Sequence, residues 1–144
     1  MDHSLIHMSD SIEYQVEPDL SVDDFISVLK SSTLAERRPM DDRDRLTRML
    51  AGASLIITAR SGGQIVGVSR ALTDGAYSTY LADLAVDATW QGRGIGRELI
   101  RRTHEAAGVN TMLILLAAPK ARSYYPHIGM QPHDSCWITL PRTE

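Results

Sequence analysis

Three glycines stand at alternate positions, Gly92, Gly94 and Gly96, within the segment TWQGRGIGRELIRR. A β-rich run, STYLADLAV, precedes them, and a charged run typical of a helix follows. The order strand, glycine-rich turn, helix brings free backbone N–H groups and the positive end of a helix dipole to one point, where a phosphate can bind. The alternative is a tight connection in which the glycines only relieve backbone strain.

Two familiar phosphate motifs do not fit this turn. A P-loop requires a lysine followed by serine or threonine after its last glycine, whereas Gly96 is followed by Arg97 and Glu98. The dinucleotide fingerprint requires the spacing GxGxxG, which the alternating glycines fail. If the turn binds a phosphate, the ligand is neither an ordinary nucleoside triphosphate nor a dinucleotide held in the usual way.

The remaining pattern predicts a single α+β domain over 11–144, preceded by a flexible N-terminal tail over 1–10. Runs of β-forming residues joined by short turns predict an antiparallel meander, and the later order strand, helix, strand predicts a parallel crossover, so the sheet is expected to be mixed. The run TMLILLAA is nearly continuously apolar, which predicts burial on both faces. The expected elements are strands over 11–16, 54–60, 64–72, 78–86, 111–118 and within 133–140, and helices over about 21–32, 41–50, 94–107 and 120–125.

Composition narrows the classes of partner. The chain has 144 residues, with 15 Lys and Arg against 18 Asp and Glu, which gives a net charge of −3. This balance does not favour nucleic acid or anionic lipid, because both select basic surfaces. The first residues lack the basic start and apolar run of a secretion signal, so a cytoplasmic location is expected. The single cysteine, Cys136, cannot form a disulfide within the chain and is expected to be buried in the last strand.

The glycine turn carries a family resemblance. The residues QGRGIG, 91–96, match position by position the Q/R-x-x-G-x-G/A motif of the GCN5-related N-acetyltransferase (GNAT) family. The run AAPKARSYYPHIGM, 117–130, is similar to a later family segment that holds an aromatic-tyrosine pair and a glycine-aromatic pair. The resemblance covers about 54–130 and implies a bacterial-type, single-domain member. The fold implied is a central mixed sheet, flanked by helices and splayed between its fourth and fifth strands, with acetyl-coenzyme A in the cleft.

The resemblance also implies which residues hold this cosubstrate. Backbone N–H groups of the glycine turn would bind the pyrophosphate, and the pantetheine arm would pair with the fourth strand like an additional β-strand. Two arginines of the turn would screen the remaining phosphate charge. The implied contacts are Leu84, Ala85, Val86, Gln91, Gly92, Arg93, Gly94, Ile95, Gly96 and Arg97. No metal is expected.

Transfer of an acyl group from a thioester to an amine requires a proton donor for the leaving thiolate and a route for the amine's proton. Tyr125 matches the position of the family's general-acid tyrosine. The sequence does not identify the general base that accepts the amine's proton. Asp83 is the first candidate, although strand alternation points it away from the face that buries Leu84. His127 and His133 are weaker candidates, and an amine of low pKa needs no dedicated base.

Two positions depart from the family pattern. The chain has AAP at 117–119 where many members have an asparagine that touches the cofactor, and Gly129 is followed by methionine rather than an aromatic residue. The first departure removes one cofactor contact, and the second exchanges one bulky apolar side chain for another.

The function expected is an N-acetyltransferase that uses acetyl-coenzyme A and works by direct attack of the amine in a ternary complex. Cys136 is a poor acyl carrier, because no clearly paired base accompanies it. A small amine or amino-acid-like compound is the first expectation for the acceptor, and a protein lysine or N-terminus is the second. The alternative from another class is a catalytically silent acyl-coenzyme A sensor. Exposed sheet edges also favour a homodimer.

Overall fold

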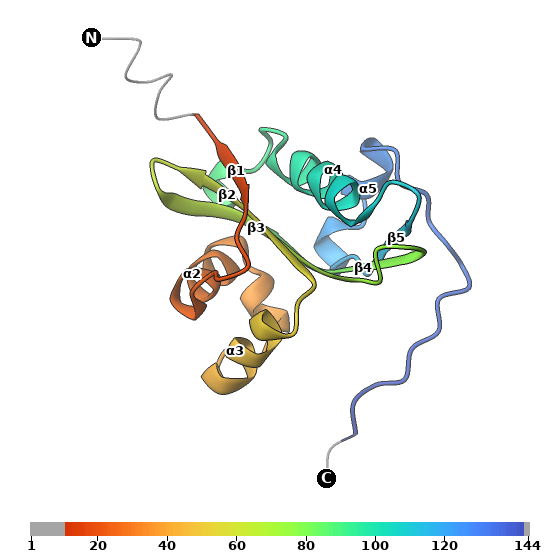
Figure 1. The fold of residues 1–144 in the computed structure, drawn as a ribbon, viewed down its shortest axis with the longest axis horizontal. Helices are drawn as coiled ribbons and strands as arrows, with labels where there is room; N and C mark the ends of the chain where they lie inside the picture. Colours follow the sequence, from red (N-terminus) through yellow and green to blue (C-terminus); the bar gives the residue numbers. More distant parts are fainter. Residues whose placement is uncertain (1–10, 143–144) are drawn as a thin grey trace.

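A five-stranded mixed sheet in the order β1-β2-β3-β4-β5 organises the protein, with helices on both of its faces (Figure 1). The structure is a computed structural model that describes residues 11–142, so the expected tail over 1–10 lies outside the described residues. The strands are β1 Glu13–Val16, β2 Leu55–Ser61, β3 Gln64–Thr73, β4 Ser78–Val86 and β5 Met112–Leu115. The helices are α2 Val22–Ser32, α3 Arg43–Ala51, α4 Ile95–Ala107 and the single turn α5 Tyr124–His127, with short 3-10 turns at Leu34–Arg37, Ala88–Trp90 and Pro119–Ala121.

The pairing of the strands confirms the predicted mixed sheet. Strands β1 to β4 pair antiparallel in sequence order, and β5 pairs parallel with β4 after the crossover through α4. The turn at 61–64 joins β2 to β3 as the expected hairpin. This order makes β1 and β5 the two edges of the sheet.

The first two helices begin where their capping residues place them. The Ser21 hydroxyl accepts a hydrogen bond from the Asp24 N–H at 3.1 Å, as the sequence predicted for the start of α2. The Asp42 carboxylate accepts from the Arg45 N–H at 3.0 Å, so this aspartate caps α3 and the helix starts slightly later than expected.

Two apolar cores lie on opposite faces of the sheet. Helices α2 and α3 cover one face through a cluster that includes Phe25, Leu29 and Leu46. Helix α4 covers the other face, where Ile95 and Leu99 pack against residues of β2 and β3. Helices α2 and α3 therefore lie across the sheet from α4 (Figure 1).

The prediction that the run 111–118 is buried on both faces is wrong. Strand β5 contains only four residues, and Met112, Ile114 and the following Leu116 are 58%, 55% and 51% exposed. The physical reason is position: β5 is the last strand of the sheet, and helices α2 and α4 pack mainly against the more central strands. An apolar run indicates burial in a sheet centre only where neighbours exist on both sides.

The prediction of a final strand within 133–140 is also wrong. Residues 131–142 have no helix or strand and extend away from the domain (Figure 1), and Cys136 is exposed rather than buried. A β-prone segment forms a strand only when another strand supplies backbone partners. The short helix expected over 120–125 is instead a 3-10 turn followed by α5, which contains Pro126 in its first turn, where a missing N–H is tolerated.

Candidate cofactor and acyl-transfer site

Strands β4 and β5 separate at the end of the sheet where β4 leads into the glycine turn. Their pairing ends at Leu81 with Leu115, whereas β4 continues to Val86. The Asp87 N–H donates to the Val66 carbonyl at 2.8 Å, so strand alternation directs the backbone groups of Leu84 and Val86 away from β3, toward the side that β5 has left. The backbone groups of Ala85 face β3. The free end of β4 thus offers two residues with backbone groups that an extended ligand can reach.

A bulge in β4 changes which side chains share a face. Arg70 pairs with Asp83, whereas the next residue, Ala71, pairs with Leu81, so Ala82 is the extra residue. The Ala82 carbonyl accepts from Nη2 of Arg38 at 2.9 Å. Because of the bulge, Asp83 and Tyr80 project to the same face, the one covered by α2 and α3.

The glycine turn forms the N-terminus of α4 without any side chain at its opening. Gly92 and Gly94 have φ values of +79° and +82°, and a Cβ atom at either position would meet nothing within 4 Å. Gly94 is the N-cap and provides no side-chain hydrogen bond, so the first N–H groups of α4, those of Ile95 and Gly96, have no partner within the helix. This arrangement fits an anion such as a pyrophosphate, because the N–H groups at a helix start attract negative charge and the space beside Gly92 and Gly94 is open.

Gly96 lies against a side chain of α5. A Cβ atom there would be 3.0 Å from the Tyr124 hydroxyl oxygen and 3.7 Å from Cζ of the same ring. Burial raises the pKa of Tyr124, with the hydrogen bond from Arg97 acting in the opposite direction. Tyr124 thus fastens α5 to the start of α4, a role that the sequence pattern did not reveal because it depends on contact between distant segments.

Tyr125 lies next to this attachment. Its ring packs edge-on against that of Tyr124, with centroids 5.3 Å apart and an interplanar angle of 76°. Burial raises the pKa of Tyr125, and the neighbouring Tyr124 raises it further. A raised pKa keeps the phenol protonated, which is the form that a proton donor needs.

Asp83 is almost fully buried between two arginines. Its Oδ1 accepts from Nε of Arg38 at 2.6 Å, and its Oδ2 accepts from Nε of Arg70. Arg38 comes from the loop before α3, whereas Arg70 belongs to β3, so the carboxylate joins the first half of the chain to the sheet. The side chain points to the face opposite Leu84, as strand alternation predicted. No local pattern in the sequence links Arg38 to Asp83, because the two residues lie 45 positions apart.

A family model for the acetyltransferase (GNAT) domain matches residues 28–136 of this chain. The chain belongs to the GNAT acetyltransferase family. The match includes α3, β2 to β5, the glycine turn, α4 and α5, so every element described above at the site lies within it. No curated protein sequence matches the chain.

Solved structures share the fold of this GNAT domain. A GNAT-family acetyltransferase of Streptococcus pneumoniae is 19% identical with a TM-score of 0.72, covering 93% of this chain and 100% of that one. An aminoglycoside acetyltransferase from an uncultured soil metagenomic sample, solved with sisomicin, is 20% identical with a TM-score of 0.67, covering 93% and 96%. An aminoglycoside N-acetyltransferase in complex with coenzyme A is 15% identical with a TM-score of 0.68, covering 92% and 96%. At these identities the similarity establishes the fold.

The other candidate residues of the GNAT domain lie on the surface. Arg93 stacks over the Trp90 ring at 4.6 Å, and the Gln91 side-chain amide donates to the Val86 carbonyl at 3.1 Å, which ties the turn back to β4. His127 is exposed at the end of α5, and His133 bonds to the Ser135 hydroxyl at 2.8 Å in the extended C-terminal segment. Within residues 11–142, neither histidine forms a hydrogen bond or ion pair with Asp83.

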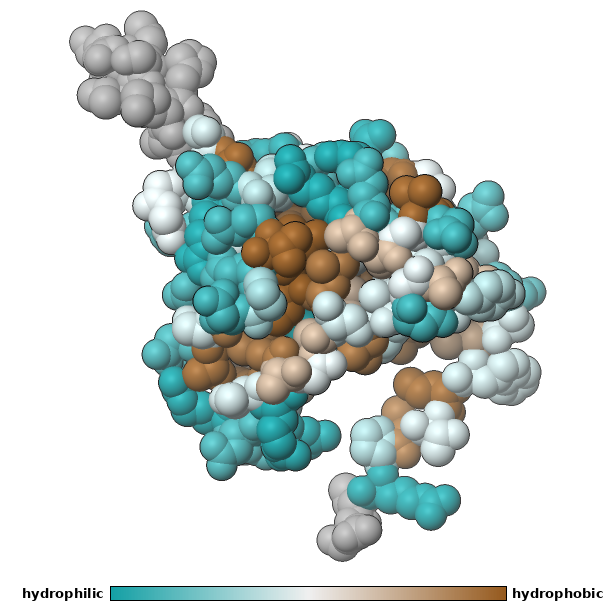
Figure 2. Space-filling view, in the orientation of Figure 1, coloured by the Kyte–Doolittle hydropathy of each residue, from teal (hydrophilic) through white to brown (hydrophobic). Residues whose placement is uncertain are grey.

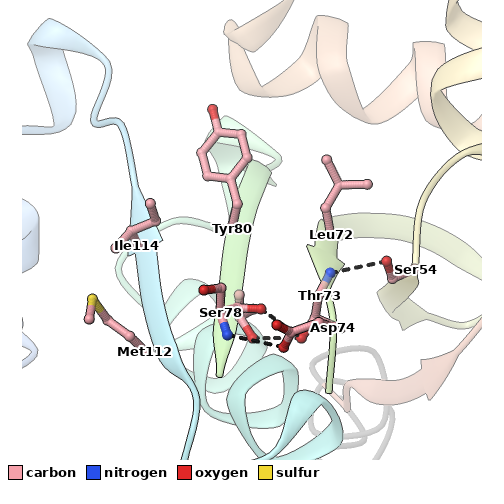
Figure 3. A pocket seen from close by; sticks show the side chains of 9 residues that line it. Ser54, Leu72, Thr73, Asp74, Ser78, Tyr80, Met112 and Ile114 are labelled. Atoms are coloured by element: carbon pink, nitrogen blue, oxygen red, sulfur yellow. Dashed lines mark hydrogen bonds between the residues drawn. The ribbon is translucent and has the colours of Figure 1, made fainter. Parts of the chain in front are cut away.

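A hollow of about 390 Å³ lies between β3, β4 and β5, at the end of β4 opposite the glycine turn (Figure 3). Leu72, Tyr80 and Ile114 form its apolar side, and their strand register places them side by side on one face. Asp74 borders the hollow, but its Oδ1 accepts from three backbone N–H groups of its own turn, which lower the pKa of the carboxyl. The wall of this hollow is therefore mainly apolar.

Within 11–142, no helix is both long and apolar enough to cross a bilayer. No cluster of three or more His, Cys, Asp or Glu side chains suited to a metal ion occurs in the same range.

Proposed function

We propose that this GNAT protein is an N-acetyltransferase that transfers the acetyl group of acetyl-coenzyme A to a primary amine by direct attack in a ternary complex. The observation that carries the proposal is the open N-terminus of α4 beside the free end of β4. The solved aminoglycoside N-acetyltransferase with coenzyme A, which has the same fold, supports the choice of cosubstrate. We place the reaction in the cytoplasm.

The proposed binding mode uses backbone groups. The N–H groups of Ile95 and Gly96 hold the pyrophosphate, with Gly92 and Gly94 keeping the approach clear of Cβ atoms. The pantetheine amides pair with the outward backbone groups of Leu84 and Val86, and Ala85 supplies the spacing between them. In addition, the guanidinium groups of Arg93 and Arg97 reduce the charge repulsion among the phosphates, and Gln91 fixes the start of the turn.

The proposed chemistry follows from the same arrangement. The cosubstrate supplies an activated acyl carbon in a thioester. A backbone N–H from the Leu84–Val86 segment donates to the oxygen that becomes negative as the amine attacks. Tyr125 gives its proton to the departing thiolate, which its raised pKa suits at neutral pH. Cys136 takes no part, because it lies in the exposed C-terminal segment.

We propose Asp83 first as the general base that accepts the amine's proton, but its existing hydrogen bonds limit how the proton can reach it. Each of its oxygens already accepts from an arginine, so the amine's proton can reach it only through a remaining lone pair or a bridging water. The same ion pairs suit a second role, that of anchoring the loop before α3. His127, His133 and release of the proton to bulk water are the alternatives. An Asp83→Asn variant separates these roles, as argued below.

The acceptor proposed first is a small amine or amino-acid-like compound, and a protein lysine or N-terminus is second. The hollow beside Tyr80 is the recess into which the amine's body would fit, and its mainly apolar wall favours a compound with an apolar portion. We expect no nucleic acid partner, since the net charge is −3.

Thermal unfolding with and without acetyl-coenzyme A tests the binding proposal. At about 100 times its dissociation constant the ligand adds about 2.7 kcal/mol, which raises the unfolding midpoint by several degrees. Gly94→Glu should abolish this shift, because it places a carboxylate at the mouth of α4. Gly62→Glu is the matched control: Gly62 also has positive φ and open space around a Cβ, but it lies in the β2–β3 hairpin.

A shift in the wild type and in Gly62→Glu, absent from folded Gly94→Glu, supports the cosubstrate site. No shift at millimolar ligand would overturn the proposal. Coenzyme A release across a panel of amines then separates an enzyme from a silent sensor, because a sensor binds the ligand firmly and releases no coenzyme A with any amine.

A further inference from the structure

Trp90 lies just before the glycine turn, at the end of the 3-10 turn Ala88–Trp90. Its side chain is partly buried against the apolar cluster under α4 that includes Ile95 and Leu99. The Trp90 N–H donates to the Asp87 carbonyl at 2.8 Å, which fixes the backbone on which the ring is mounted. Trp90 is therefore held through both its side chain and its backbone.

The ring of Trp90 supports the guanidinium of Arg93. Cζ of Arg93 lies 4.6 Å from the ring centroid, within the range of a cation–π interaction. Arg93 stands between Gly92 and Gly94, both with positive φ, and glycine neighbours have no side chains that could steer an arginine. The contact with Trp90 thus gives this long side chain a defined place beside the open N-terminus of α4.

The arginines farther along α4 are engaged by a carboxylate. The outer side of this helix is mainly hydrophilic (Figure 2), and it carries Arg101 and Arg102. Both donate to the Glu98 carboxylate at 2.7–2.9 Å, which offsets their positive charge. Arg93 belongs to the turn itself, so its charge lies nearest in the chain to the point where an anion would bind.

From these contacts we propose that Trp90 is a positioning residue that holds the guanidinium of Arg93 toward the pyrophosphate of the cosubstrate. The inference rests on the proposed function, because it takes acetyl-coenzyme A as the ligand of the turn. A guanidinium stacks through its face, whereas its N–H donors lie in its plane and reach phosphate oxygens from the edge. An arginine that is already supported loses less conformational freedom when the ligand binds.

A double-mutant cycle on coenzyme A binding, measured by isothermal titration calorimetry, tests this role. Trp90→Leu removes the ring and should weaken the dissociation constant about threefold to tenfold. Arg93→Ala removes the charge and should weaken it about tenfold. The double variant should lose no more than Arg93→Ala alone, because the ring acts through the arginine. Thermal unfolding checks that each variant is folded.

Two further variants separate support of the arginine from packing. Trp90→Phe keeps an aromatic face for the guanidinium and should recover most of the affinity that Trp90→Leu loses. Trp137→Leu is the matched control, because it makes the same substitution at the chain's other tryptophan, which is 91% exposed in the C-terminal segment. Its dissociation constant should equal that of the wild type.

Dephospho-coenzyme A identifies which phosphate Arg93 serves. This compound keeps the pyrophosphate and lacks the 3′-phosphate, so Trp90→Leu should weaken its binding by the same factor as that of coenzyme A. A loss confined to coenzyme A would overturn the assignment to the pyrophosphate.

Failure of the positioning role is distinguishable from failure of the proposed function. A wild type that does not bind coenzyme A at millimolar concentration would overturn both. If the wild type binds but the losses of Trp90→Leu and Arg93→Ala add in the double variant, the ring acts by packing and the positioning role alone is overturned. The same holds if Trp90→Phe binds as weakly as Trp90→Leu.

Discussion

At the scale of single residues, the adjacent tyrosines Tyr124 and Tyr125 differ in their surroundings. The Tyr124 hydroxyl lies against Gly96 at the start of α4, whereas Tyr125 is the proposed proton donor. The tyrosine pair was visible in the sequence, and the family resemblance selected Tyr125. The attachment of Tyr124 was not visible, since it depends on how α5 packs against α4.

Tyr125→Phe should lower kcat by about a hundredfold or more, while acetyl-coenzyme A still raises the unfolding midpoint. The phenol donates only when protonated, and burial raises its pKa above 10, so wild-type kcat should decline only as the pH rises beyond that value. The variant should lack this alkaline decline. Steady-state rates across pH measure both effects, with Tyr77→Phe, at an exposed tyrosine, as the control. An unchanged kcat in Tyr125→Phe would show that Tyr125 is not the general acid.

Asp83→Asn should destabilise the fold by about 3–5 kcal/mol, because it leaves the guanidinium groups of Arg38 and Arg70 without their counter-charge. Urea denaturation measures the loss, and Asp41→Asn, at an exposed aspartate, should change little. If Asp83 is also the base, kcat of the folded variant falls and its dependence on pH changes. A large loss of stability with a normal kcat would mean that Asp83 anchors the loop before α3 and is not the base.

At the scale of elements, a polar cluster joins β1, β2 and α2. Glu17, which follows β1, accepts from Nε and Nη2 of Arg60 in β2 at 3.0 and 2.7 Å, and the same Nη2 donates to Asp24 in α2 at 2.9 Å. The edge strand β1 has only four residues, so these side-chain bonds supplement the few backbone hydrogen bonds that hold it to β2. The cluster thus supports the N-terminal side of the fold, far from the glycine turn in the sequence.

The hydrogen bonds from Arg60 lower the pKa of Glu17 to about 2 from its usual value near 4.5. A lowered pKa means that this stabilisation is complete above about pH 4.5 and is lost as the pH falls toward 2. Glu17→Gln should therefore lose about 1–2 kcal/mol at neutral pH and show a flatter decline in stability between pH 4.5 and 2. Urea midpoints measured across this range provide the check, with Glu13→Gln, in β1, as the control. An unaltered acid profile would mean that the cluster contributes nothing.

At the scale of the whole molecule, residues 131–142 form the segment that the domain leaves uncovered (Figure 1). We expect chymotrypsin to cut first after Trp137, because exposed segments without secondary structure are cleaved before a folded domain. Mass spectrometry of timed digests identifies the first product. A first cut within the strands of the sheet would contradict this expectation.

The sequence alone determined the order of the helices and strands as far as β5, the caps of α2 and α4, the mixed sheet and the family, because these depend on periodicity, turn chemistry and a contiguous motif at 91–96. Only the tertiary structure decided what neighbours each element has. It placed Asp83 between Arg38 and Arg70, set Tyr124 against Gly96, and left β5 at the edge of the sheet. The physical reason is that burial and pairing depend on segments distant in the chain, whereas the sequence pattern reports the preferences of each segment by itself.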